Sequence, residues 1–142
     1  MIVASPRLRA WVIGMLSIAA AANDMGDVVA GLTLAGIEMD AAVLDAKGQP
    51  LLAVCVCEGP PPASLRGSLA KLGLPEAWLI NARSGKATFL QAETNGRLRP
   101  VAADRNGVYY ATLHQELFFP AAWFGEPPSV WDILSYWQII DG

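Results

Sequence analysis

Two cysteines and one histidine are the side chains that could bind a soft metal ion. Cys55 and Cys57 lie two residues apart in an apolar run, and the only histidine is His114. A structural zinc ion takes four ligands, and these residues supply at most three. In a strand both thiols point to one face, where they cannot easily form a disulfide. The pattern predicts buried, reduced thiols of a cytoplasmic protein and a surface or capping histidine.

Phosphate-binding chemistry has little support in the sequence. The glycines of Gly31–Gly36 lack the lysine and the strand-to-helix setting of a P-loop. Arg97, Arg99 and Arg105 lie near predicted turns, where they could touch phosphates. The net charge is −3, so the chain has no overall positive field for a nucleic-acid backbone. Nucleic-acid binding is therefore possible but not favoured.

Aromatic residues are concentrated near the C-terminus. Seven of the twelve aromatic residues fall within twenty positions: Phe118, Phe119, Trp123, Phe124, Trp131, Tyr136 and Trp137. Packing of a last helix on a sheet accounts for most of such a cluster. A domain of this size rarely has interior room for all of them, and Trp and Tyr are favoured at interfaces. We therefore interpret these seven residues as the candidate surface for a protein partner or a homo-oligomer.

The elements that position these residues follow from periodicity and turn signals. Helices are expected over 6–22, over 65–72 and after Ser129, and strands over 28–37, 39–45, 51–57, 75–81 and 86–91. Residues 51–57 are apolar at every position, which is typical of a strand covered on both faces. Asn95-Gly96 and Asn106-Gly107 predict further hairpins. The fold class is therefore α/β (α+β), with a mixed central sheet, an N-terminal helix, one crossover helix and an antiparallel C-terminal meander.

Composition predicts one domain over residues 1–142 with an extensive apolar interior. Hydrophobic residues make up 54% of the 142 positions and charged residues 16%. The segment Ala10–Ala22, preceded by Arg7 and Arg9, imitates a signal peptide. Its apolar residues recur at helical spacing and are too few to span a bilayer. We interpret it as a packed helix without a membrane span, and an uncleaved export signal remains the alternative.

The segment from about Met39 to Phe124 resembles the Uma-two family of restriction-endonuclease-like proteins, within the PD-(D/E)xK nuclease superfamily. The resemblance rests on Met39–Asp45, on Gln49–Cys57 and above all on Leu72–Asn81, where Gly73, Glu76 and Trp78 stand at the family's positions. It implies a restriction-endonuclease-like fold for the chain.

The resemblance also implies an active site that is degenerate here. In such nucleases two carboxylates hold Mg²⁺ at the scissile phosphate, and a lysine stabilises the developing charge. Asp40 stands at the first carboxylate position, but Cys55 and Cys57 stand where the second acid and the lysine are expected. A thiol is a poor ligand for Mg²⁺, because this ion prefers oxygen. Strand alternation directs Glu58, the nearest other acid, to the face opposite Cys55.

Two hypotheses follow. The first is a catalytically inactive nuclease-like domain without a cofactor, which serves as a protein-binding or assembly module. The alternative is an active Mg²⁺-dependent DNA endonuclease with a metal site formed by Asp40 and Glu58. Arg66, on the crossover helix, could replace the family's helical lysine, although a solvent-exposed arginine is the simpler interpretation.

Overall fold

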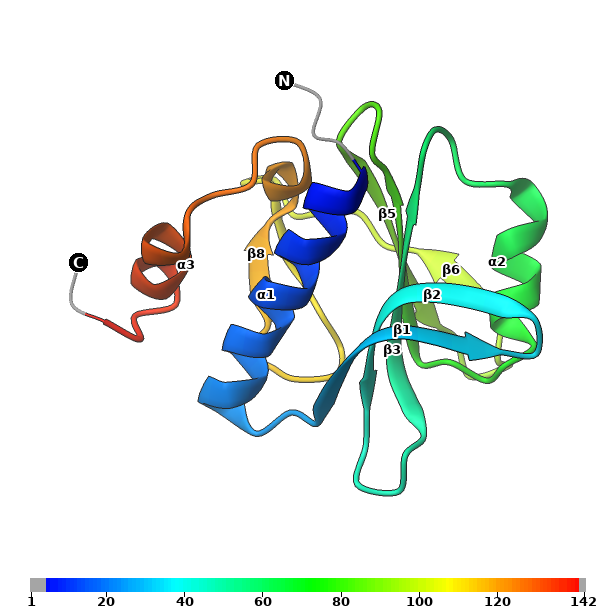
Figure 1. The fold of residues 1–142 in the computed structure, drawn as a ribbon. Helices are drawn as coiled ribbons and strands as arrows, with labels where there is room; N and C mark the ends of the chain where they lie inside the picture. The colour runs from blue at the N-terminus through cyan, green and yellow to red at the C-terminus, as the bar shows by residue number, and fades with distance from the viewer. Residues whose placement is uncertain (1–4, 141–142) are drawn as a thin grey trace.

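A computed structural model describes residues 5–140, in which helices precede and follow two runs of strands (Figure 1). The elements are α1 (Ser5–Asn23), β1 (Asp27–Leu34), β2 (Ile37–Leu44), β3 (Pro50–Cys57), α2 (Ala63–Ala70), β4 (Glu76–Asn81), β5 (Lys86–Ala92), β6 (Leu98–Pro100), β7 (Val108–Tyr110), β8 (Phe118–Pro120), the 3-10 helix η1 (Ala121–Phe124) and α3 (Val130–Tyr136). The expected α+β class is confirmed, with helix bounds within two residues of the prediction at α1.

The main sheet has six strands in the order β1-β2-β3-β4-β5-β6. Only β3 and β4 pair in parallel, and α2 is the crossover between them. All the other neighbours pair antiparallel, as expected where short turns connect them. The mixed sheet and its single crossover helix are therefore as the sequence predicts.

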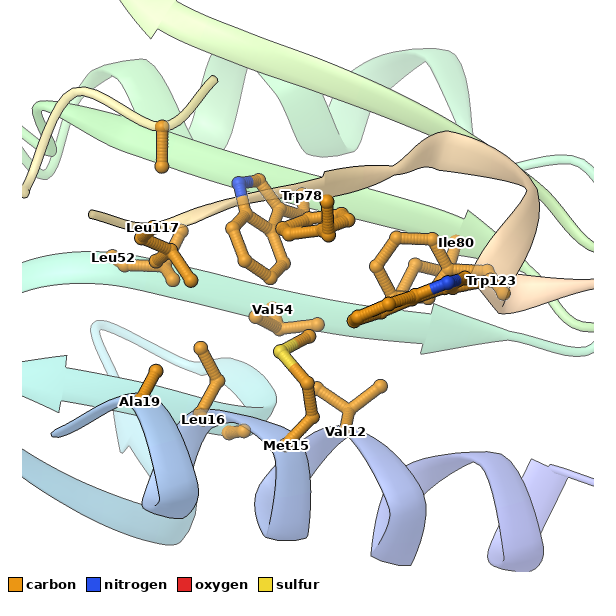
Figure 2. Close-up of a cluster of buried hydrophobic side chains, with 14 of the residues drawn as sticks. Val12, Met15, Leu16, Ala19, Leu52, Val54, Trp78, Ile80, Leu117 and Trp123 are labelled. Atoms are coloured by element: carbon orange, nitrogen blue, oxygen red, sulfur yellow. The ribbon is translucent and has the colours of Figure 1, made fainter. Parts of the chain in front are cut away.

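Each face of the sheet has its own hydrophobic core. Val54 of β3 belongs to the cluster under α1, whereas Ala53 and Cys55 belong to the cluster under α2. Figure 1 shows α1 and α2 on opposite sides of the sheet. Figure 2 shows Val12 and Met15 of α1 directed at the strands. This arrangement confirms the prediction that 51–57 is covered on both faces.

The C-terminal meander is only partly as predicted. Asn95-Gly96 does connect β5 to β6, but β7 and β8 form a separate two-stranded sheet. Asn106-Gly107 lies in a tight turn in which the Gly107 N–H donates to the Asp104 carbonyl. The aromatic side chains of β7 and β8 are buried against the face of the first sheet. If these strands instead continued the first sheet beyond β6, the same side chains would be left in water, so the second sheet is separate.

The ring of Trp78 is the centre of that aromatic contact. It is fully buried in β4 and meets Phe89, Tyr109, Phe119 and Phe124 at centroid distances of 5.2–6.1 Å. These contacts are edge-to-face, an arrangement that aromatic quadrupoles favour. Strands β7 and β8 and helix η1 thus share one face of the sheet with α1.

A buried carboxylate connects the two sheets. Within residues 6–140, Glu76 is the only buried polar or charged side chain. Its Oε2 accepts hydrogen bonds from Trp78 Nε1 at 2.8 Å and from the Tyr109 hydroxyl, and its Oε1 accepts two from Thr112, through N and Oγ1, both at 2.8 Å. Four donors compensate the loss of water around this carboxylate.

The contact between the β4–β5 turn and η1 requires glycine. Gly85 has φ +75°, and a Cβ at this position would lie 2.4 Å from the Cα of Gly125. A larger residue would therefore force the turn away from η1.

None of the helices described within residues 5–140 is long and apolar enough to cross a membrane.

We expect Glu76→Gln to lower the free energy of unfolding by about 3 kcal/mol, because the amide NH₂ would face a buried donor. Urea denaturation measures this change. Glu93→Gln is the matched control, because Glu93 is exposed, and it should change stability by less than about 0.5 kcal/mol. Equal effects of the two substitutions would contradict the structural role of Glu76.

Stability should also fall at alkaline pH because of Tyr109. Burial, and then the neighbouring charge of Glu76, raise the pKa of the Tyr109 hydroxyl. The unfolded chain therefore loses this proton first, at about pH 10, while the folded chain keeps it. The free energy of unfolding should decrease above that pH by up to about 1.4 kcal/mol per pH unit. Urea denaturation at several alkaline pH values should show a smaller slope for Tyr109→Phe, and an unchanged slope would exclude this cause.

Candidate functional site

The β1–β2 hairpin changes face where Gly31 lies opposite Asp40. The registered pairs run on both sides of this position, but Gly31 and Asp40 themselves are not paired. Before the break Ala41 packs in the cluster under α1, and beyond it Met39 packs in the cluster under α2. Gly31 has φ +77°, a conformation that suits glycine, and this permits the kink.

Strand β2 leaves β3 at the same point. Their pairing extends from Leu44 to Ala41 and no further, which leaves the β3 backbone beyond Val54 without a β2 partner. The Asp40 carboxylate replaces the missing strand, because its Oδ2 accepts a hydrogen bond from the Val56 N–H at 2.6 Å. Asp40 thus satisfies a backbone donor that would otherwise be orphaned at the fork between the strands.

The other oxygen of this carboxylate is also engaged. Arg9, on α1, places its Nε 2.6 Å from Asp40 Oδ1. Of the two side chains, Asp40 is 21% exposed and Arg9 43% exposed. The first candidate metal ligand is therefore held by a guanidinium and a backbone amide.

The two thiols lie beside this carboxylate and are not bonded to each other. Burial, followed by the charges of Asp40 and Cys57, raises the pKa of Cys55 to about 12. Burial and then Asp40 raise the pKa of Cys57 as well. The Cys55 thiol lies 3.9 Å from the Glu38 carbonyl, to which it is a weak donor. Both thiols therefore stay protonated at neutral pH, a state that neither binds metal nor acts as a nucleophile.

The other candidates predicted for the nuclease site are more exposed than Asp40 and Cys55. Glu58 is exposed just after the end of β3. Arg66 is exposed on α2, and its guanidinium donates to the Leu98 carbonyl at the edge strand β6. Among the described residues 5–140, no group of three or more histidine, cysteine or acidic side chains could hold a metal ion. His114 Nδ1 accepts a hydrogen bond from the Glu116 N–H in a turn, which agrees with the capping alternative of the prediction.

The seven aromatic residues of the candidate interface divide into three groups by burial. Phe119, Trp123 and Phe124 are buried in the chain's own core, so a partner cannot reach them in this structure. Their burial corrects the interface assignment of these three residues, because β8 and η1 lie flat on the sheet. Phe118 and Trp137 are partly buried, and the Trp137 indole donates to the Phe118 carbonyl. Trp131 and Tyr136 remain exposed.

Sequence reasoning missed several residues of both regions. Arg9 was considered only as part of a signal-like segment, because no local pattern connects it with Asp40. Tyr110, Val130 and Ile139 are exposed large hydrophobic residues beside the predicted aromatic set. The sequence does not reveal their exposure, because it depends on which face of the short helix α3 and of the β7–β8 hairpin packs against the domain.

No protein-family model and no curated protein matches this chain.

Substitutions at the fork should separate the roles of the two Asp40 oxygens. Asp40→Asn keeps an oxygen for the Val56 N–H and loses the ion pair, so we expect a cost of about 1 kcal/mol or less, similar to that of Arg9→Leu. Asp40→Ala should cost a further 1–3 kcal/mol, approximately, because the buried N–H loses its acceptor. Urea denaturation compares the variants. Equal stability of Asp40→Asn and Asp40→Ala would rule out a capping role.

Proposed function

We propose that this chain is a catalytically inactive PD-(D/E)xK nuclease-like domain that acts as a protein-binding or assembly module, as a subunit of a larger complex or a homo-oligomer. The fold part of the proposal is supported by the parallel pair β3 and β4 with one crossover helix. It is also supported by a physical role for the residues that carry the resemblance. Gly73 has φ +72° just after α2, and Glu76 bonds Trp78 inside the core.

The proposed loss of catalysis rests on one observation: both oxygens of the Asp40 carboxylate already accept a bond within the chain. Oδ1 accepts from Arg9 Nε and Oδ2 from the Val56 N–H, each at 2.6 Å, so one lone pair of each oxygen is already engaged and a Mg²⁺ ion would compete with the guanidinium for this carboxylate. The guanidinium adds a positive charge at the place where a cation would bind, and the two cations repel. The Cys55 thiol beside them is not an oxygen ligand. These residues do not fit a Mg²⁺ site.

The binding part of the proposal is supported by the exposed aromatic and aliphatic side chains of the C-terminal region. Trp131 is 70% exposed and Tyr110 is 55% exposed. Exposed apolar side chains that gather in one region are typical of an interaction surface. We place the protein in the reducing cytoplasm, which is consistent with two free cysteines.

A plasmid-nicking assay tests the loss of catalysis. We expect the full chain to produce no more nicked plasmid with Mg²⁺ or Mn²⁺ than with EDTA, because Asp40 is held by Arg9 and by the Val56 N–H. Asp40→Asn is the matched variant, since it retains an acceptor for the Val56 N–H. It should behave as the unmodified chain does.

Metal-dependent nicking that Asp40→Asn abolishes would contradict the proposal. It would favour the alternative, a Mg²⁺-dependent endonuclease that uses Asp40 and Glu58. In that case Glu58→Gln should also remove the activity, because the second ligand would be lost.

A further inference from the structure

Exposed large hydrophobic side chains are confined to one part of the chain. Within residues 5–140, all of them belong to β7 or to the segment from α3 onward: Tyr110, Val130, Trp131, Tyr136 and Ile139. We call these five residues the C-terminal surface. A chance scatter of surface hydrophobics would place some on the other helices and strands.

Aromatic contacts connect β7 to α3 across this surface. The Tyr110 ring stacks on Phe118, and Phe118 contacts Tyr136, with centroid distances of 5.9 Å in both pairs. Two other tryptophans satisfy their indole N–H groups internally, Trp11 on the Pro128 carbonyl and Trp137 on the Phe118 carbonyl. These two bonds attach the C-terminal segment to the domain, which Figure 1 shows with α3 at its outer side, and Trp131 of α3 is 70% exposed.

The negative charge of the chain is also concentrated in its C-terminal part. Residues 106–142 contain no lysine or arginine and four acids, Glu116, Glu126, Asp132 and Asp141, so they contribute −4. The net charge of the whole chain is −3, which leaves +1 for residues 1–105. Asp132 is exposed next to Trp131 on α3. Exposed Asp104 is close enough to Tyr136 that its charge contributes, after burial and Tyr110, to raising the pKa of that hydroxyl.

We infer that the C-terminal surface binds a basic, amphipathic segment of a partner protein, and this inference rests on the proposed binding function. The apolar face of such a segment would cover Tyr110, Tyr136 and Ile139. Its lysine or arginine side chains would pair with Asp104 and Asp132 and stack on the Trp131 indole. A cation over an indole face is attracted by the ring quadrupole, and Trp131 is 70% exposed, so a partner can reach it.

The charge around the C-terminal surface argues against a second copy of this chain as its partner. Two copies that meet through this surface across a twofold axis would bring two acidic segments together, each with a charge of −4 over residues 106–142. Like charges at an interface oppose association, whereas a basic segment gains from the same acids.

Calorimetric titration of the full chain with two designed helical peptides tests the inference. Both peptides carry one leucine face; the first has lysine and arginine on its polar face, and the second has glutamate in their place. We expect the basic peptide to bind at least about tenfold more tightly than the acidic one, with an affinity that falls as salt is added. Trp131→Ala should weaken its binding about tenfold or more. Lys47→Ala, in the β2–β3 turn, is the control and should have no effect.

Either of two other outcomes overturns the inference. Equal binding of the two peptides, or binding of neither, excludes a basic partner. Sedimentation that shows a dimer of the chain dissociated by Trp131→Ala identifies a second copy as the occupant.

Two controls accompany the titration. Unchanged unfolding of Trp131→Ala in urea shows that the effect of this substitution on binding is not caused by loss of the fold. Metal-dependent plasmid nicking refutes the proposed function, whereas an inert chain that ignores the basic peptide refutes only this inference.

Discussion

The buried carboxylate of Glu76 is the constraint on which the relative placement of the two sheets depends. Its four donors come from β4, from β7 and from the residue Thr112 that follows the second sheet's first strand. A buried acid with fewer donors would destabilise the fold, so β7 must lie where Tyr109 and Thr112 reach it. Gln91 of β5 donates in turn to the Tyr109 hydroxyl, which extends the network across the sheet.

This placement decides which aromatic residues become core. With Tyr109 fixed over β4, the Trp78 ring is enclosed by Phe89, Phe119 and Phe124, and the rest of that face is left to α1. The short helix α3 follows after the face is already filled. It therefore keeps only part of its surface against the domain, with Ile133 buried and Trp131 outside. The seven aromatic residues are therefore buried to different extents because α1, β7, β8 and η1 occupy the sheet face and leave little of it for α3.

Local patterns predicted the regular elements well because each one has its own signal. The apolar run of β3, the helical stripe of α1 and the Ser129 cap are all encoded within a few residues, and Ser129 Oγ does accept from the Asp132 N–H. The separate β7–β8 sheet and the Arg9–Asp40 pair could not be predicted in this way. Both depend on contacts between residues distant in sequence, for which a single chain offers no local pattern.

The fork at Asp40 also shows how an aspartate can be needed for the fold without taking part in catalysis. A strand that departs from its neighbour leaves an N–H without an acceptor, and Asp40 supplies one to Val56 whether or not a metal is bound. The cost of losing that acceptor opposes replacement of this aspartate even without catalysis. Positions 55 and 57, where the resemblance would place an acid and a lysine, carry thiols that accept no such bond from the strand backbone within residues 5–140, Cys55 buried and Cys57 partly buried. A carboxylate at this position is therefore weak support for nuclease activity, and function has to be argued from the complete site.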